Sequence, residues 1–266
     1  MLTESTEMKE IQNTERINEL IYRLWSEPVL AIKDIEQTLY GGFNLSLEEQ
    51  DRATWILQCE QTRHWVNVTQ PQILLVNSNE AGHTRVSCAS LFSAILITAM
   101  ERSGNSIVLS WFCGLRTECG PLEILKSFTT QLLSKTNLDL SWMKEVWFSA
   151  FNPDNPSHVL KLFCRLVKQQ LAKSLVICVL DGLTFYEDED RFEDLCDLMR
   201  ELTTLVDDGL SEQYILKILA TSPTRSLYGD RRSRLSSQEI LDVPDYVDGA
   251  NMGISDRDIK MVTDFV

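Results

Sequence analysis

Short, continuous apolar segments alternate with longer helical segments from Pro71 onward, and this alternation restricts the possible folds of the chain severely. The apolar segments are rich in β-branched residues, which is typical of strands buried on both faces of a parallel sheet. Helices that connect such strands cover both faces of the sheet. The sequence therefore predicts an α/β fold, a three-layer sandwich around a mainly parallel five-stranded sheet. The predicted strands are residues 72–76, 107–112, 175–180, 214–220 and 239–243, and the predicted helices between them are residues 84–101, 121–134, 156–173 and 191–208.

The first seventy residues are predicted to be helical. Apolar residues between Ile11 and Leu24 recur at helical spacing, and Pro28 follows them. A second apolar series, residues 29–39, predicts another helix, which we expect to stop at Gly41-Gly42. These helices precede the sheet in the chain.

Residues 46–49, Ser-Leu-Glu-Glu, match a capping box, which predicts the start of a third helix that continues through Trp65. We divide the chain into an N-terminal helical segment, residues 1–68, and an α/β domain, residues 69–266. The apolar spacing near the C-terminus predicts a last helix that begins near Ser255.

The chain is acidic, with 25 Lys and Arg residues against 39 Asp and Glu residues and a net charge of −14. Such a surface repels phosphate backbones and anionic lipid headgroups. No apolar stretch reaches the roughly 18–20 residues that a membrane helix requires. The composition therefore predicts protein partners, with no nucleic acid and no membrane, and it leaves the oligomeric state open.

The seven cysteines are scattered along the sequence, and none of them forms a CxxC pair. The three histidines are also far apart, so the sequence shows no framework for a zinc site. The N-terminus is polar and acidic, unlike a secretory signal. These features predict free thiols in a cytoplasmic protein.

The turn after the first predicted strand aligns with the phosphate-binding pattern G-x-x-x-x-G-K-[ST]. Asn77 then takes the first glycine, Gly82 the second, His83 the lysine and Thr84 the hydroxyl residue. Histidine carries much less positive charge than lysine at pH 7, and Glu80 adds a negative charge within the loop. These four aligned residues are candidates for a weak phosphate site, with Thr84 also a candidate magnesium ligand. The alternative is an ordinary strand–turn–helix connection.

The third predicted strand ends at Asp181, in the position at which P-loop enzymes place a magnesium-binding aspartate. The acidic residue that usually follows it is absent, because Thr184 and Phe185 occupy the nearby positions. The acidic residues 187–190 come later and are interpreted as a solvated turn. Asp181 is therefore a candidate metal ligand, and its alternative role is to cap the next element.

The fourth predicted strand is followed by Thr221 and then by Arg225. A hydroxyl and a cation at a strand end could contact the γ-phosphate of a nucleotide. A turn around Pro223, with Arg225 in solvent, explains the same residues equally simply.

Taken together, these segments resemble the NACHT-like domain of fungal nephrocystin-like proteins, within the STAND class of P-loop NTPases. The resemblance covers roughly residues 45–265, although no single motif is intact. It implies a P-loop NTPase-like five-stranded sheet, ATP or GTP at the first loop, magnesium near Asp181, and a nucleotide-controlled signalling switch. The segments that carry it are residues 55–65, 72–84, 110–114, 175–183 and 217–225.

The motifs occur in the order expected for a P-loop NTPase, but several of the residues that bind phosphate and magnesium in such proteins are replaced. The sequence therefore predicts a non-catalytic or weakly nucleotide-binding signalling or scaffold module that acts through protein–protein contacts, with no catalytic residue assigned. The alternative is an active magnesium-dependent NTPase switch with an atypical first loop, in which a different basic group replaces the lysine.

Overall fold

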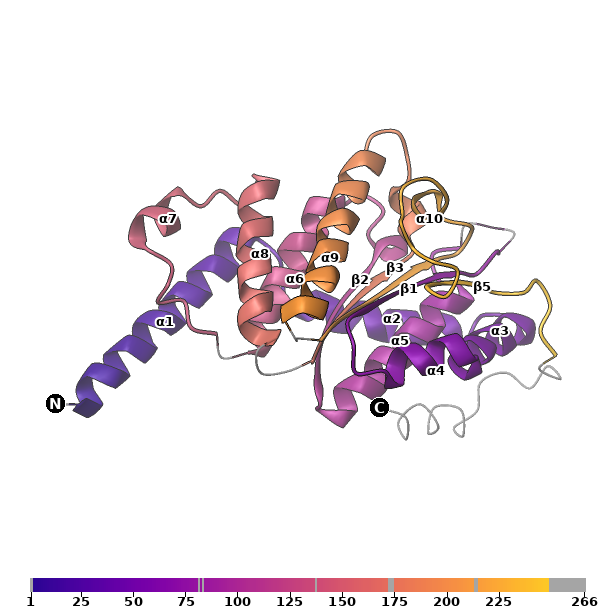
Figure 1. The fold of residues 1–266 in the computed structure, drawn as a ribbon, viewed down its shortest axis with the longest axis horizontal. Coiled ribbons are helices and arrows are strands. Elements are labelled where there is room, and N and C mark those ends of the chain that lie inside the picture. The colour runs from indigo at the N-terminus through magenta and orange to yellow at the C-terminus, as the bar shows by residue number, and fades with distance from the viewer. Residues whose placement is uncertain are drawn as a thin grey trace.

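The computed structural model describes residues 2–80, 82, 84–136, 138–171, 175–212 and 215–248. The helix expected from near Ser255 lies outside the described residues. The described residues form a three-layer α/β sandwich (Figure 1). Its sheet has five parallel strands in the order β2-β3-β4-β1-β5. The predicted α/β class and five-stranded sheet are confirmed. The strands are β1 (Gln72–Asn77), β2 (Ser106–Phe112), β3 (Leu175–Asp181), β4 (Leu216–Ser222) and β5 (Ile240–Asp242).

The helices of the described residues cover both faces of this sheet (Figure 1). They are α1 (Leu2–Leu24), α2 (Val29–Gly42), α3 (Leu47–Gln58), α4 (Glu60–Asn67), α5 (Cys88–Ser103), α6 (Pro121–Lys135), α7 (Glu145–Ala150), α8 (Pro156–Leu171), α9 (Phe192–Glu212) and α10 (Leu227–Arg231), with short 3₁₀ turns at η1 (Cys113–Leu115) and η2 (Leu183–Tyr186).

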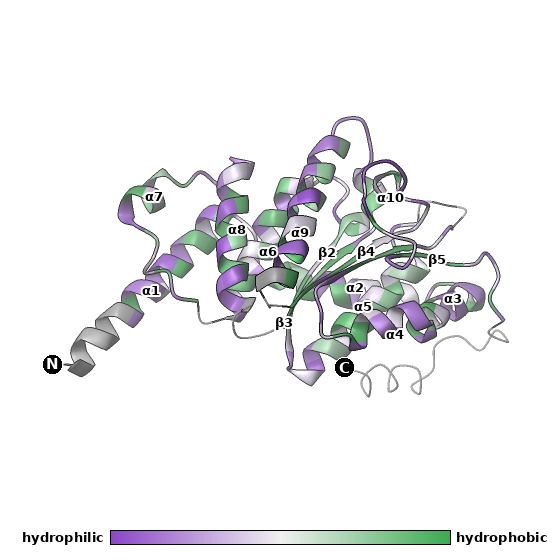
Figure 2. Cartoon of the chain, viewed as in Figure 1, coloured by the Kyte–Doolittle hydropathy of each residue, from purple (hydrophilic) through white to green (hydrophobic). Residues whose placement is uncertain are grey.

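The two helical layers, one on each face of the sheet, follow from the alternation of side chains along each strand. In β1, Ile73 and Leu75 pack into the core formed with α1, α6, α8 and α9. Leu74 and Val76 pack into the second core, formed with α2 to α5. Since both faces are buried, the strands are apolar along almost their whole length, as the colouring of Figure 2 shows.

The N-terminal helices pack on the helices that cover the sheet. α1 contacts α6, and α2 and α3 contact α5. The expected stop at Gly41-Gly42 is confirmed, because Gly42 is the last residue of α2. A side chain at Gly42 would overlap the side chain of Leu91 on α5, so this glycine also allows the two helices to pack closely.

The predicted third helix is divided into two. The capping box is confirmed, since Ser46 Oγ accepts from the Glu49 N–H at 3.2 Å and Glu49 accepts from the Ser46 N–H at 2.8 Å. The helix ends at Gln58, however, because Cys59 has an extended backbone. The Cys59 sulfur then accepts from the Thr62 N–H at 3.4 Å and caps α4.

Replacing Ser46 with alanine should lower the free energy of unfolding by about 1 kcal/mol, because α3 loses its N-cap. Urea denaturation would measure the change. Ser46→Asp is the matched control, since an aspartate can accept the same bond. An alanine variant as stable as the aspartate variant would contradict the capping role.

A buried lysine links the sheet to α4. Lys217 on β4 is 2% exposed, and its Nζ donates to the carbonyl oxygens of Val66, at 2.8 Å, and Trp65. Burial lowers the pKa of Lys217 to about 8. These carbonyls lie at the C-terminal end of α4, where a helix lacks internal donors. The lysine therefore fixes this helix to the sheet.

Candidate functional site

Polar side chains gather where β1, β3 and β4 end. The register pairs Asn77 with Ser222, and β4 lies between β1 and β3. The last residues of these strands, together with Thr221, therefore meet at one edge of the sheet. In open α/β sheets, ligands bind at this carboxyl edge, where the strand order reverses.

Asp181 is the centre of this polar cluster. Its side chain is 1% exposed, and both of its carboxylate oxygens accept hydrogen bonds from hydroxyl groups. Ser90 Oγ donates to Oδ2 at 2.7 Å, and Thr221 Oγ1 donates to Oδ1 at 2.5 Å. Burial raises the pKa of Asp181 to about 6, although these two hydrogen bonds oppose the shift. The carboxylate is satisfied within the protein.

Ser90, and not Thr84, supplies the hydroxyl group beside Asp181. The helix expected from residue 84 begins at Cys88, because Ser87 is the N-cap and forms a capping box with Ser90. Thr84 therefore precedes the helix, and its hydroxyl donates to Glu80 at 3.2 Å. The role of Thr84 as a magnesium ligand stays a prediction, and in this structure its hydroxyl group is bonded to Glu80 instead of lying beside Asp181. The Ser-x-x-Ser spacing would have identified Ser90 from the sequence.

A carboxylate occupies the N-terminus of α5. Glu80 Oε1 accepts from the backbone N–H of Cys88, the first residue of the helix, at 2.7 Å. Burial raises the pKa of Glu80, and its bond from Cys88 opposes the shift. A helix N-terminus binds anions through such N–H groups and its dipole. Glu80 therefore lies where a nucleotide-binding loop would hold phosphate.

The first loop position has a structural role. Asn77 is 3% exposed and lies at the end of β1, where its Nδ2 donates to Asp242 at 2.9 Å and its Oδ1 accepts from the Ser226 N–H. A left-handed backbone occurs two residues later, at Asn79, with φ of 55°. Asn77 thus joins β1, β5 and the start of α10.

The second loop position shows no glycine requirement. A Cβ at Gly82 would have no atom within 4 Å, and its φ is outside the left-handed region. His83 lies outside the described residues.

Arg225 is not part of the polar cluster. Its side chain is 65% exposed, and its Nε donates to Asp230 at 2.8 Å. Glu187, which was interpreted as part of a solvated turn, instead accepts from the backbone N–H groups of Leu227 and Tyr228 at the start of α10. The predicted γ-phosphate contact of Arg225 thus has no counterpart in this geometry, whereas Thr221 does lie in the cluster.

A buried arginine also reaches the loop. Arg52 on α3 is 6% exposed and donates to the carbonyl oxygen of Ser78, directly after β1. A single sequence carries no signal for this contact, because the two residues are 26 positions apart. Arg52 holds the start of the loop against the N-terminal helices.

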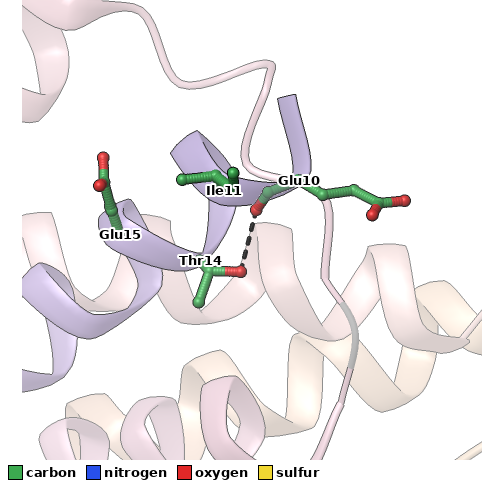
Figure 3. Close-up of a pocket in the computed structure, with 4 residues that line it drawn as sticks. All are labelled: Glu10, Ile11, Thr14 and Glu15. Atoms are coloured by element: carbon green, nitrogen blue, oxygen red, sulfur yellow. Dashed lines mark hydrogen bonds between the residues drawn. The ribbon is translucent and has the colours of Figure 1, made fainter. Parts of the chain in front are cut away.

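The described residues offer no cluster of three or more His, Cys, Asp or Glu side chains that could hold a metal ion. Their seven cysteines are free, as predicted. A surface groove of about 380 Å³ on α1 is lined by Glu10, Ile11, Thr14 and Glu15 (Figure 3). The two carboxylates of this groove lie on α1, which contributes no residue to the cluster around Asp181. None of the described helices is long and apolar enough to span a bilayer.

The sequence model of the family described as nephrocystin 3, N-terminal, matches residues 51–222, which is more than half of the chain. The chain belongs to this family. The matched region begins in α3 and ends with β4, so it includes Asp181, Ser90 and Thr221. Comparison with curated proteins gives no significant match.

Among solved structures, this nephrocystin 3 N-terminal domain is similar to the ORC1 protein of Aeropyrum pernix, which was solved in complex with DNA. The TM-score is 0.43 and the sequence identity is 13%. The similarity covers 73% of this chain and 50% of the ORC1 chain, so the match spans half of the length of that protein.

The sequence predicts a magnesium nucleotide at this edge of the sheet, and P-loop proteins bind magnesium through a loop hydroxyl and a strand-end aspartate. The described residues do not fit a bound magnesium nucleotide. Ser90 and Asp181 bond to each other, Thr221 occupies the second carboxylate oxygen, and Glu80 takes the helix N–H group.

Proposed function

We propose that this domain is a NACHT-like module of the STAND class that does not hydrolyse nucleotide and acts in signalling or scaffolding through protein–protein contacts in the cytoplasm. The proposal rests on one observation: the polar groups that would bind a magnesium nucleotide are already hydrogen-bonded to one another within the protein. A carboxylate replaces phosphate at α5, and two hydroxyl groups replace a metal ion at Asp181.

Electrostatics also support the absence of hydrolysis. Phosphoryl transfer depends on positive charge positioned around the phosphates. The site instead holds two carboxyl groups, those of buried Asp181 and half-buried Glu80. Burial raises the pKa of Asp181, and the charge of Glu80 adds to this shift. Arg225, the candidate cation, is paired with Asp230 on the surface. A nucleotide triphosphate entering this edge would meet negative charge.

Calorimetric titration with Mg-ATP and Mg-GTP tests the proposal. The wild-type protein should show no binding at micromolar concentrations and no phosphate release. The double variant Glu80→Ala with His83→Lys should gain binding, because it frees the α5 N–H group and supplies a cation. Glu118→Ala with His83→Lys is the matched control, because Glu118 is an exposed carboxylate in the loop between η1 and α6.

The alternative, an active magnesium-dependent NTPase, makes the opposite prediction. Wild-type turnover that Asp181→Ala abolishes would overturn the proposal. If the wild-type protein bound ATP or GTP with micromolar affinity but without turnover, the bonds at Glu80 and Asp181 would not exclude nucleotide, and this part of the proposal would be overturned.

A further inference from the structure

Seven large apolar side chains are exposed between the end of α1 and the start of α3. Four of them are aromatic, and each of these is at least 73% exposed; the other three are 51% exposed. Monomeric proteins rarely expose apolar side chains in such density, and exposed patches of this kind mark interaction sites. We call these seven residues the α2 band: Tyr22, Trp25, Val29, Ile32, Tyr40, Phe43 and Leu47.

The α2 band lies on the side of α2 that faces away from the core. Ile35 and Thr38 are buried against the second core, whereas Val29, Ile32 and Tyr40 recur at helical spacing on the other side. α2 belongs to the layer with α3 to α5 (Figure 1). The exposed side of α2 therefore combines these three apolar residues with the charged Lys33 and Glu36, a mixture typical of protein interfaces.

The backbone at Trp25 supports this interpretation. Trp25 has φ of 50°, in the left-handed region that bulky residues avoid, and its side chain is 85% exposed. Its ring lies 6.3 Å from that of Tyr22. Unfavourable backbone of this kind concentrates at functional positions. The bend between α1 and α2 therefore holds two aromatic rings outward at one end of the α2 band.

The α2 band is nearly symmetric about a midpoint that falls between Asp34 and Ile35 of α2. Lys33 and Glu36 flank this midpoint, and Val29 and Tyr40 lie equally far from it in the sequence. Two aromatic residues, at positions 22 and 25, precede the helix, and apolar residues at positions 43 and 47 follow it. A two-fold axis at the midpoint would place Lys33 of one copy against Glu36 of the other, and Val29 against Tyr40. Interfaces between identical chains are self-complementary in this way.

We propose that the α2 band binds a second copy of this chain, through antiparallel pairing of the two α2 helices about a two-fold axis. The size of the α2 band agrees with this occupant. Four aromatic side chains of about 150–250 Å² each, mostly exposed, provide roughly 450–800 Å² per copy before the aliphatic residues are added. A stable interface buries about 800 Å² per partner.

The net charge of −14 opposes association of two copies. The attractive contribution is short-range and apolar, whereas the repulsion is long-range and screened by salt. The dimer should therefore become tighter as the salt concentration rises. This inference goes beyond the proposed function, because dimerisation does not depend on whether the site at Asp181 binds nucleotide.

Sedimentation velocity from low to high micromolar concentrations tests the proposal. The wild-type protein should reach twice the monomer mass of 30.5 kDa. Tyr40→Glu should weaken the dimer by at least about 100-fold, because it buries a charge in the apolar contact. Val146→Glu is the matched control, since Val146 is 83% exposed on α7, outside the α2 band, and this variant should still dimerise.

Charge exchange tests the antiparallel register. Lys33→Glu and Glu36→Lys should each weaken self-association, because each places like charges together twice. An equal mixture of the two variants should recover the dimer mass, because every facing pair is again of opposite sign. A mixture that stays monomeric would overturn the register.

Two results would overturn the proposal as a whole. If the wild-type protein remained monomeric at high micromolar concentration, the α2 band would bind a different protein instead of a second copy. A dimer that persists in Tyr40→Glu but is lost in Val146→Glu would place the interface on another surface. Neither result depends on nucleotide binding, so each is distinguishable from a failure of the proposed function.

Discussion

Replacing Gly114 with alanine should lower the free energy of unfolding by about 3 kcal/mol, because the added Cβ has no space. It would lie 2.5 Å from the backbone oxygen of Arg85 and 2.9 Å from the ring of Phe185. The backbone oxygen belongs to the loop before α5 and cannot rotate away as a side chain can. Thermal and urea denaturation would measure the loss.

Gly82→Ala is the matched control for this variant. A Cβ at Gly82 meets no atom within 4 Å, so its stability should change by less than about 0.5 kcal/mol. If Gly114→Ala were as stable as Gly82→Ala, the loop before α5 would not pack against η1 as described. The comparison therefore tests the position of the loop that leads to Ser90.

Replacing Asp181 with asparagine should raise the free energy of unfolding at pH 7.5 by about 2–3 kcal/mol. Burial raises the pKa of Asp181 to about 6 in the folded protein, whereas an unfolded aspartate titrates near its ordinary value of 3.8. The folded state therefore binds the proton more tightly. Ionisation of Asp181 destabilises the fold progressively as the pH rises from about 4 to 6, and the full cost persists above that range.

The stabilising effect of Asp181→Asn should accordingly vanish below about pH 4 and be complete above about pH 6. Urea denaturation at a series of pH values would measure it. Asp190→Asn, at an exposed position, is the control and should change stability little. A stability loss in Asp181→Asn at pH 7.5 would contradict the description of Asp181, since it would mean that the ionised form is favourably held.

The sheet could be predicted from the sequence because each strand is a continuous apolar segment between two helical ones. That pattern arises directly from burial on both faces, and it places Asp181 and Thr221 at strand ends without any tertiary information. The joint position of these two residues follows from the parallel order alone. The predicted edge of the sheet and the observed polar cluster therefore coincide.

The start of α5 could not be predicted from the phosphate-binding pattern. The pattern assigns the helix start to Thr84, whereas local capping by Ser87 moves it to Cys88 and brings Ser90 to Asp181. Contacts such as that of Lys217 with α4 depend on positions about 150 residues apart, for which a single sequence carries no periodic signal. The start of α5 thus depends on local hydrogen bonds and the position of α4 on tertiary contacts, and the motif alone predicts neither.

The bond from Cys88 to Glu80 has a thermodynamic consequence. A free ligand stabilises a folded protein by an amount that grows with its concentration, so proteins that bind nucleotides gain stability when nucleotide is abundant. Glu80 is covalently part of the chain and is present at the α5 N-terminus whenever the domain is folded. Its contribution is therefore independent of any metabolite, and the domain should have the same melting temperature in energy-rich and energy-depleted cells.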